Sequence, residues 1–246
     1  MVQKREASLY VRQPYQTYPL VVLPDNIRTL SPTRQWILDH HDVKKFGPRL
    51  CLLDDDLRFD TRRKDKPDLF LKATDKDMVR MFTQLENLLS KFAHAGILGR
   101  EGGNRVMEPY RFATRMMRVL AYHVPTVRKV KARFDRVPCK QDFDMTLQML
   151  RAGYTNAVIC AYVQGQGRGS GAVGGCSAYR TMEMMEKTCY KLAKLHPGLV
   201  KVVERETVSA WGGGQHDIPV VRKEVEMAWK KAYDQGVEKF GVGRLV

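Results

Sequence analysis

The chain has 246 residues, of which 43% are hydrophobic, and its formal net charge at pH 7 is +15. This length suffices for one large domain with a substantial core, and the basic excess favours a polyanionic partner, with nucleic acid as the first candidate. No apolar stretch reaches the roughly 20 residues of a membrane span, and the first residues lack the apolar core of a signal peptide. We therefore expect a cytoplasmic protein with no membrane partner. The five cysteines form no C-x-x-C pair, which indicates reduced thiols and no zinc site.

Two short strands with a helix between them are predicted in the first quarter of the chain. Residues 20–24 are an apolar run closed by proline, and Ser31 followed by Pro32 has the pattern of an N-cap and a first helical position. Residues 49–53 are a second apolar run, short enough to be a strand buried on both faces. Strand, helix and strand at this spacing predict a βαβ unit with parallel pairing.

Three carboxylates, Asp54, Asp55 and Asp56, follow the second strand directly. Unpaired charge is costly to bury, so we expect these side chains at the strand's end, where they bind a cation. Mg²⁺ prefers oxygen ligands and completes its shell with substrate phosphates, and open α/β sheets bind ligands at the carboxyl ends of their strands. The pair Asp54 and Asp56 resembles the metal-binding Asp-x-Asp of GT-A-fold glycosyltransferases. An acidic triplet in a solvated turn is the alternative.

The middle of the chain alternates between predicted helices and strands. Thr74 and Asp77 have the spacing of a helix capping box, which opens an apolar stripe of helical period. Residues 96–100 and 157–163 are predicted strands, and residues 145–153 a short helix with a glycine stop. This alternation indicates an α/β fold.

Basic residues gather in two predicted elements of the middle region. Those of residues 111–118 have the spacing of one helical face, and those of residues 129–133 alternate with apolar residues as on a strand. We expect the two elements to form one surface that tracks nucleic-acid phosphates, with contacts from Arg115, Arg118, Lys129, Lys131 and Arg133. A solvated charged surface is the alternative.

A glycine-rich segment, residues 164–175, lies between a predicted strand and a helix at residues 177–195. Backbone N–H groups of such a loop, at the N-terminus of a helix, suit phosphate or a sugar diphosphate, and a linker is the alternative. The segment does not match the Walker pattern. A strand near residues 199–203 and a helix at residues 224–235 complete the chain.

Four stretches in this order carry a resemblance to a known family. They are Leu-Asp-Asp-Asp-Leu at 53–57, Gln-Asp-Phe-Asp at 141–144, Leu-Gln-Met-Leu-Arg-Ala-Gly-Tyr at 147–154, and Gly-Gly-Cys-Ser-Ala-Tyr-Arg-Thr at 174–181. From about residue 20 onward, the chain resembles the GT-A-like DNA glycosyltransferases found beside TET/JBP-type oxygenases in bacteriophages. Those enzymes transfer a sugar to the hydroxyl of 5-hydroxymethylcytosine in viral DNA.

The resemblance implies a fold and a cellular setting. The expected fold is α/β and GT-A-like (Rossmann-like), with a mixed, mostly parallel sheet and helices on both faces, in a single domain of residues 1–246. We expect an abbreviated nucleotide-binding element at the N-terminus, since residues 10–14 are the only counterpart to the family's usual first turn ahead of the strand at residues 20–24. A nucleobase that is held differently is the alternative. The setting is the cytoplasm of a phage-infected bacterium.

The resemblance also assigns roles to residues. Asp54 and Asp56 correspond to the site for the metal and the diphosphate, and Arg34 to the arginine that faces the donor nucleotide. Asp142 corresponds to the acidic residue that faces the acceptor.

Four further positions follow from the later motifs. Gly174, Gly175 and Arg180 correspond to the turn near the sugar donor. His216 corresponds to a late histidine that many GT-A enzymes add to the metal, with a surface-loop histidine as the alternative.

These assignments predict a metal-dependent transfer, with Mn²⁺ or Mg²⁺, from a nucleotide sugar, such as a UDP-sugar, to hydroxymethylated DNA. Asp142 is the expected general base, and the metal neutralises the departing diphosphate. Two other functions share the clustered carboxylates or the basic charge. They are a metal-dependent nuclease and a non-catalytic nucleic-acid-binding protein.

Overall fold

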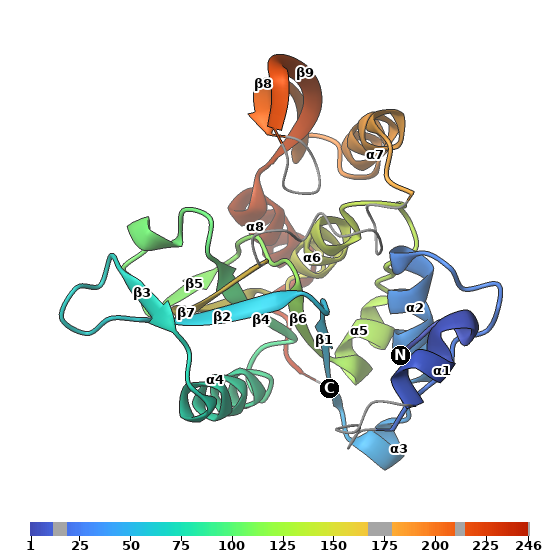
Figure 1. Cartoon of the computed structure of the whole chain (residues 1–246), viewed down its shortest axis with the longest axis vertical. Coiled ribbons are helices and arrows are strands. Elements are labelled where there is room, and N and C mark those ends of the chain that lie inside the picture. The colour runs from blue at the N-terminus through green and yellow to red at the C-terminus, as the bar shows by residue number, and fades with distance from the viewer. Residues whose placement is uncertain (12–18, 167–178, 210–214, 246) are drawn as a thin grey trace.

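The computed structural model describes residues 1–11, 19–166, 179–209 and 215–245. It has a mixed α/β fold built on an open seven-stranded sheet of order β1-β6-β4-β7-β2-β3, in which β5 also pairs with β7 (Figure 1). The strands of this sheet are β1 (Arg49–Leu53), β2 (Leu57–Arg62), β3 (Phe70–Lys72), β4 (His94–Gly99), β5 (Tyr110–Phe112), β6 (Val119–His123) and β7 (Asn156–Gln166).

The sheet is mixed, but its strands are mostly antiparallel. Among the described strands, only β4 and β7 pair in parallel. The prediction of a mostly parallel sheet is therefore wrong. The reason is that β6 inserts between β1 and β4 and runs antiparallel to both, and β2 and β5 both run antiparallel to β7. Pairing between strands so distant in sequence leaves no local signal.

The predicted βαβ unit is not present. Within residues 19–24, Val22 makes an isolated parallel bridge to Val2, and β1 pairs antiparallel with β6 at the edge of the sheet. Strand β1 is also not buried on both faces. Leu52 is buried, whereas its neighbour Leu53 is 49% exposed. The core cluster beneath α4 contains residues of β4, β6 and β7 but none of β1.

Helices cover both faces of the large sheet, as predicted. On one face lies α4 (Asp75–Leu88), which packs Met81 and Leu85 against Ile97 of β4 and Ile159 of β7. The capping box of Thr74 with Asp77 opens this helix, which confirms the local prediction. The opposite face carries α2 (Leu30–His40), α5 (Val124–Val130) and α6 (Gln141–Arg151) (Figure 1). Shorter helices are η1 (Lys4–Glu6), α1 (Ala7–Val11), α3 (Val43–Phe46) and η2 (Gly103–Arg105).

Three local predictions are corrected. Residues 111–118 are not a helix: they form the end of β5 and an irregular segment that leads to β6. Residues 129–133 are not a strand, because α5 continues to Val130 and Lys131 then takes a left-handed conformation with φ of 58°. Ser31 is not the N-cap of α2, since the helix begins at Leu30 and the Ser31 hydroxyl donates to the carbonyl of Pro138 at 3.0 Å.

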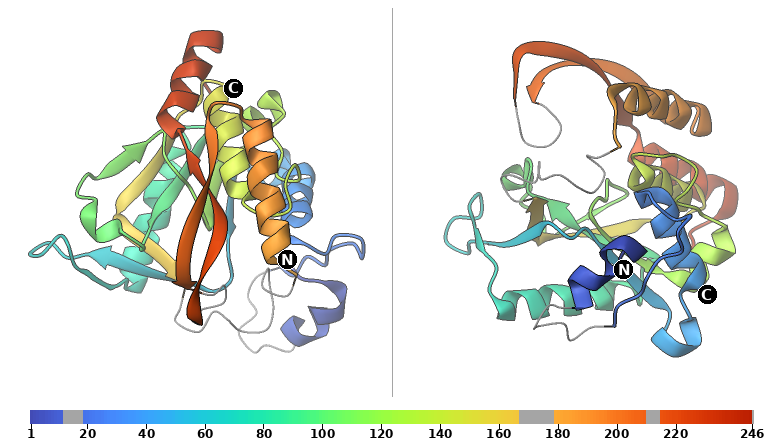
Figure 2. Two further views of the ribbon diagram at one scale, coloured as in Figure 1. Left: turned by 90° about the horizontal axis from the view of Figure 1, so that it is seen from above. Right: turned by 45° about the vertical axis from the view of Figure 1, so that its right-hand side comes forward.

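The C-terminal part of the chain forms a third layer over α6. It comprises α7 (Met182–Leu195), β8 (Val200–Ser209), β9 (Gln215–Met227) and α8 (Trp229–Phe240). The strands β8 and β9 form a separate antiparallel ribbon, so the helix predicted at residues 224–235 begins only at Trp229 (Figure 2). Leu147 and Leu150 of α6 pack against Leu192 of α7 and Ala232 of α8. No helix in the described part of the chain is long and apolar enough to cross a lipid bilayer.

A buried polar network joins α6 to the C-terminal end of α7. Asp144 and His196 are both fully buried, and Oδ1 of Asp144 lies 2.6 Å from Nε2 of His196. Arg151 contacts the other ring nitrogen, Nδ1, at 3.1 Å. A guanidinium can only donate, so Nδ1 accepts and Nε2 carries the proton that it donates to Asp144. Arg136 and Gln148 reach Oδ2 of Asp144 at 3.4 and 2.9 Å. The network aligns α6, which begins at Gln141 beside the candidate site.

We expect Gly236→Ala to destabilise the fold through the contact of α8 with α6. A Cβ at Gly236 would lie 2.2 Å from the carbonyl oxygen of Leu150 and 2.7 Å from the backbone nitrogen of Gly153. Backbone cannot yield as a side-chain end can, so the loss of unfolding free energy should be about 1–3 kcal/mol. Urea denaturation followed by circular dichroism measures it. The exposed Gln235→Ala is the control in the same helix, and equal stabilities of the two variants would contradict the close approach.

Candidate active site

The acidic triplet directly follows β1, at the border of the sheet where the carboxyl ends of its parallel strands lie. We call this border the acidic edge. Strands β1, β4 and β7 end at this edge, and β2 begins there, with Leu57 opposite Gln166. The backbone nitrogen of Asp54 donates to the carbonyl of Arg118 at 3.2 Å. One carboxylate oxygen of Asp56 accepts from Nε2 of Gln166 at 3.3 Å. The triplet thus lies where ligands bind to open α/β sheets.

Arg34 of α2 holds Asp54 through a buried ion pair. Its Nη2 donates to Oδ1 of Asp54 at 2.6 Å, and the two side chains are 5% and 23% exposed. The residues that α2 buries include Ser31, Arg34 and Gln35, so this helix presents a polar face to the interior. Gln35 accepts from the backbone nitrogen of Phe134 at 2.8 Å, which fixes the helix in place.

Asp142, in the first turn of α6, interacts electrostatically with the same cation, Arg34. Burial raises the pKa of Asp142, and the positive charge of Arg34 acts in the opposite direction. Burial likewise raises the pKa of Asp54, Arg34 lowers it, and the negative charges of Asp142 and Asp56 raise it again. The structure therefore brings Arg34, Asp54, Asp56 and Asp142 into one electrostatic group. Arg34 is the cation that both carboxylates share.

The other residues predicted for the donor site lie near the limits of the described segments or outside them. Gly174 and Gly175 are outside the described residues. Arg180 is half-buried in the segment that enters α7, next to Tyr179, whose hydroxyl accepts from the backbone nitrogen of Leu30 at 3.2 Å. This contact brings the segment to the start of α2. The backbone of His216 belongs to β9, but its side chain is outside the described part of the structure.

The residues predicted to contact nucleic acid differ in exposure and in ion pairing. Arg115 is exposed after β5, but the Arg118 side chain is only 14% exposed and pairs with Glu101 at 3.0 Å. Lys129 and Lys131 are exposed at the end of α5, and Arg133 pairs with Asp135 at 2.6 Å. Arg115 and Arg118 lie between β5 and β6, whereas Lys129 and Lys131 lie at the end of α5, whose Arg128 donates to the carbonyls of Leu38 and His41 at the end of α2.

A divalent metal fits the donor set only together with a substrate. Within the described residues, no group of three or more His, Cys, Asp or Glu side chains is arranged to hold a metal ion. Asp54 and Asp56 supply two carboxylates, and Arg34 contacts one oxygen of Asp54. Mg²⁺ is commonly bound by one or two carboxylates plus substrate phosphates, which matches this set.

Several residues at this edge escaped the sequence prediction. Gln164 contacts Arg118 and the carbonyl of Met117, at 3.5 and 3.2 Å, and Gln166 contacts Asp56. A signal for both existed, since they follow the predicted strand at residues 157–163 directly. Tyr122 has no such signal: its hydroxyl is fully buried, has no hydrogen-bond partner among the described residues, and is influenced by the charges of Arg34 and Asp142.

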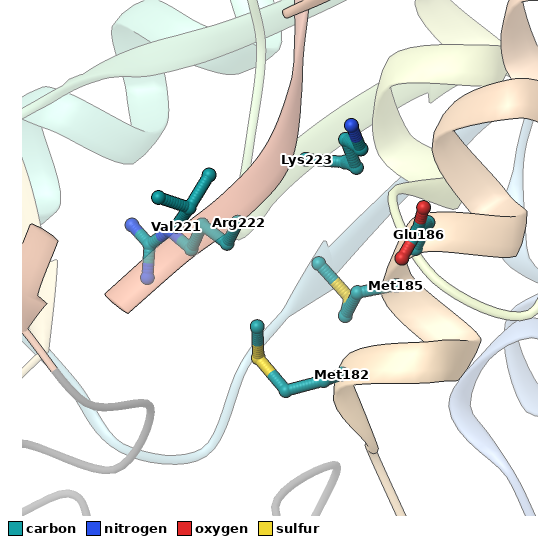
Figure 3. A pocket seen from close by; sticks show the side chains of 6 residues that line it. All are labelled: Met182, Met185, Glu186, Val221, Arg222 and Lys223. Atoms are coloured by element: carbon teal, nitrogen blue, oxygen red, sulfur yellow. The ribbon is translucent and has the colours of Figure 1, made fainter. Parts of the chain in front are cut away.

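Two surface pockets flank α7. One, of about 60 Å³, lies between α7 and β9, with Met182, Met185 and Glu186 on the helix side (Figure 3). The second, of about 400 Å³, is lined by Pro138, Thr181 and residues of α7 that include Lys187 and Lys191. Among the described residues, neither pocket includes the carboxylates of the candidate site. The carboxylates at the acidic edge are therefore the groups that can carry the chemistry.

Open α/β sheets bind ligands at the carboxyl ends of their strands. Carboxylates and a buried arginine at this position indicate a ligand-binding α/β protein. Comparison with known families is more specific. Residues 1–175 match the model of the TET-associated glycosyltransferases, so the chain belongs to this family and is a glycosyltransferase. The match includes Arg34, Asp54, Asp56 and Asp142, whereas Arg180 and His216 lie beyond it. No curated protein and no solved structure matches the chain.

We expect Arg34→Ala to destabilise the protein, and to do so more at pH 7 than at pH 4. Without Arg34, the charged forms of Asp54 and Asp142 lose the cation that lowers their pKa values, which then rise further. Acid protonates these carboxylates in the folded state and removes the penalty. The loss at pH 7 should be on the order of 3 kcal/mol, measured by chemical denaturation across pH.

The control for this experiment is Arg133→Ala, which breaks the more exposed pair with Asp135 and should cost about 0–1 kcal/mol. An Arg34→Ala loss that is independent of pH would contradict the shared electrostatic role.

Proposed function

We propose that this glycosyltransferase moves a sugar from a nucleotide-sugar donor, a UDP-sugar, to the hydroxyl of 5-hydroxymethylcytosine in DNA, with Mn²⁺ or Mg²⁺. The observation that carries the proposal is the group of Arg34, Asp54 and Asp142 at the carboxyl ends of the strands, inside the segment that matches the family. The net charge of +15 supports a polyanionic acceptor.

The donor diphosphate is the ligand that suits the acidic edge and its cation. Asp54 and Asp56 would hold the divalent ion, which, when bound, neutralises charge on the departing diphosphate. Burial raises the pKa of the half-buried Asp54, and Arg34 opposes this shift, because its charge and its hydrogen bond favour the carboxylate. This function of Arg34 is independent of any direct contact with the donor.

Asp142 is the general base in this proposal. The bond between the anomeric carbon and the diphosphate oxygen breaks, and its electrons leave with the diphosphate. The hydroxymethyl oxygen forms the new bond to the anomeric carbon, and its proton passes to the Asp142 carboxylate. Direct displacement of this kind inverts the anomeric configuration. A pKa raised by burial makes Asp142 a stronger proton acceptor than an exposed aspartate.

The acceptor base must reach this edge from a duplex. Enzymes that act on a base generally extrude it from the stack, unless the reacting group is accessible in the major groove. Contacts to the phosphate backbone then fix the register of the protein on DNA and make affinity depend steeply on salt. Arg115, Lys129, Lys131 and Arg133 remain candidates for such contacts.

The direct test combines the protein with Mn²⁺, hydroxymethylcytosine DNA and a panel of UDP- and GDP-sugars, followed by digestion and mass spectrometry of the nucleosides. A hexose or N-acetylhexosamine mass on one nucleoside is the expected result. Asp54→Asn and Asp56→Asn should each lower the rate by about 10²–10³, since electrostatic stabilisation of the leaving group is lost.

The control in the same turn is Asp55→Asn, because Asp55 is exposed; its rate should be that of the wild type. Transfer that persists without metal and in both site variants would contradict the metal role. DNA cleavage with Mg²⁺ and no donor would indicate a nuclease instead.

We expect Asp142→Asn to reduce transfer by about 10²–10⁴ while raising the melting temperature at pH 7. Because burial raises the pKa of Asp142, the folded state binds its proton more tightly than the unfolded state does. The wild type therefore loses stability as pH rises from the ordinary aspartate range through the folded pKa. The asparagine variant lacks this loss, so its advantage should shrink toward pH 4. A variant that is active, or less stable than the wild type at pH 7, would contradict the assignment.

A further inference from the structure

The β2–β3 hairpin, residues 57–72, projects from the sheet, and its tip stands clear of the other elements in all three views (Figures 1 and 2). It carries six basic and three acidic residues. The basic residues are Arg58, Arg62, Arg63, Lys64, Lys66 and Lys72. A projecting basic element is suited to contact a polyanion.

Arg62 makes the hairpin a rigid element. Its guanidinium donates to the carbonyls of Cys160 in β7, Gly103 in η2 and Pro67 in the hairpin tip. The same group lies over the ring of Phe70, 4.7 Å from the centroid. Arg62 is thus committed to backbone carbonyls and connects the base of the tip loop to β7 and η2. A preorganised element loses little conformational freedom when a ligand binds.

The tip itself has two cations that are available for a ligand. Arg63 pairs with Asp65, and Asp68 also acts on Arg63 electrostatically. Lys64 and Lys66 are exposed, and none of the described residues pairs with either of them. Long lysine side chains with free ammonium groups contact phosphates as point charges and do not read sequence.

We propose that the β2–β3 hairpin contacts the phosphate backbone of the duplex acceptor through Lys64 and Lys66. This inference rests on the proposed function, because it assumes that DNA reaches the acidic edge. Strand β2 begins directly after Asp56 and is six residues long, so the tip lies about 20 Å further along the strand. At 3.4 Å per base pair, this span is about six base pairs. The hairpin then sets the register of the duplex relative to the reacting base.

Another explanation of the tip lysines is protection of the sheet edge. β3 is the last strand of the sheet, and lysines on edge strands hinder pairing between copies of a protein. The two explanations differ in what the loss of Lys64 and Lys66 does. Edge protection predicts self-association with unchanged DNA binding.

The test compares three double variants on a duplex of 30 base pairs with one central hydroxymethylcytosine. They are Lys64→Ala/Lys66→Ala, the matched control Lys44→Ala/Lys45→Ala on the exposed helix α3, and Lys129→Ala/Lys131→Ala on α5. Affinity is measured across salt concentrations. The slope of log K against log salt is negative. We expect its magnitude to decrease by about 2 in the hairpin variant, because two phosphate contacts are lost, and to be unchanged in the α3 control.

An unchanged slope in the hairpin variant overturns the proposal. If self-association in light scattering accompanies the unchanged slope, the lysines protect the edge; if the α5 variant alone lowers the slope, DNA binds to the α5 surface.

The register is tested by shortening the duplex on one side of the modified base at a time. Transfer by the wild type should fall once one arm is shorter than about six base pairs, and the hairpin variant should lose this dependence. Equal length dependence in both proteins overturns the assigned register.

The two proposals fail separately. A lower slope in the hairpin variant without sugar transfer by the wild type leaves the hairpin contact standing and removes the acceptor assignment. Sugar transfer by the wild type, with equal slopes in the wild type and the hairpin variant, supports the acceptor assignment and removes the hairpin contact.

Discussion

The ion pair between Arg34 and Asp54 is the constraint on which the candidate site depends. Two carboxylates, Asp54 and Asp142, are drawn into the protein near each other, and each would be driven toward its neutral form without a cation. Arg34, itself buried, supplies that cation from α2. The pair also ties three elements together, because α2, the end of β1 and the first turn of α6 meet at this charge.

The position of α6 depends in turn on the C-terminal layer. One side of the helix packs on the sheet through Met145 and Met149, and the other packs on α7 and α8. The Asp144–His196 contact fixes its rotation, since a fully buried carboxylate must keep its hydrogen bonds. The family match ends at residue 175, so elements outside the match hold a helix that carries a site residue within it.

Basic charge is distributed differently from the sequence pattern. Spacing indicated one surface from residues 111–118 and 129–133, but these residues belong to other elements than the pattern predicted, and Arg118 and Arg133 form ion pairs. The hairpin at residues 57–72, a basic loop in sequence, instead combines a rigid base with exposed lysines. Charge counts do not distinguish a cation bound to protein carbonyls, such as Arg62, from one free to bind a ligand.

The sequence by itself determined the local features of this protein. A capping box at Thr74, an apolar run that ends in carboxylates at Asp54, and an acidic first turn at Asp142 are local patterns, because hydrogen bonds and periodicity act over a few residues. Only the tertiary structure decided that β6 separates β1 from β4, that the sheet is mostly antiparallel, and that Arg34 reaches Asp54. These depend on contacts between distant residues, whose free energy arises from packing and burial and leaves no periodic trace along the chain.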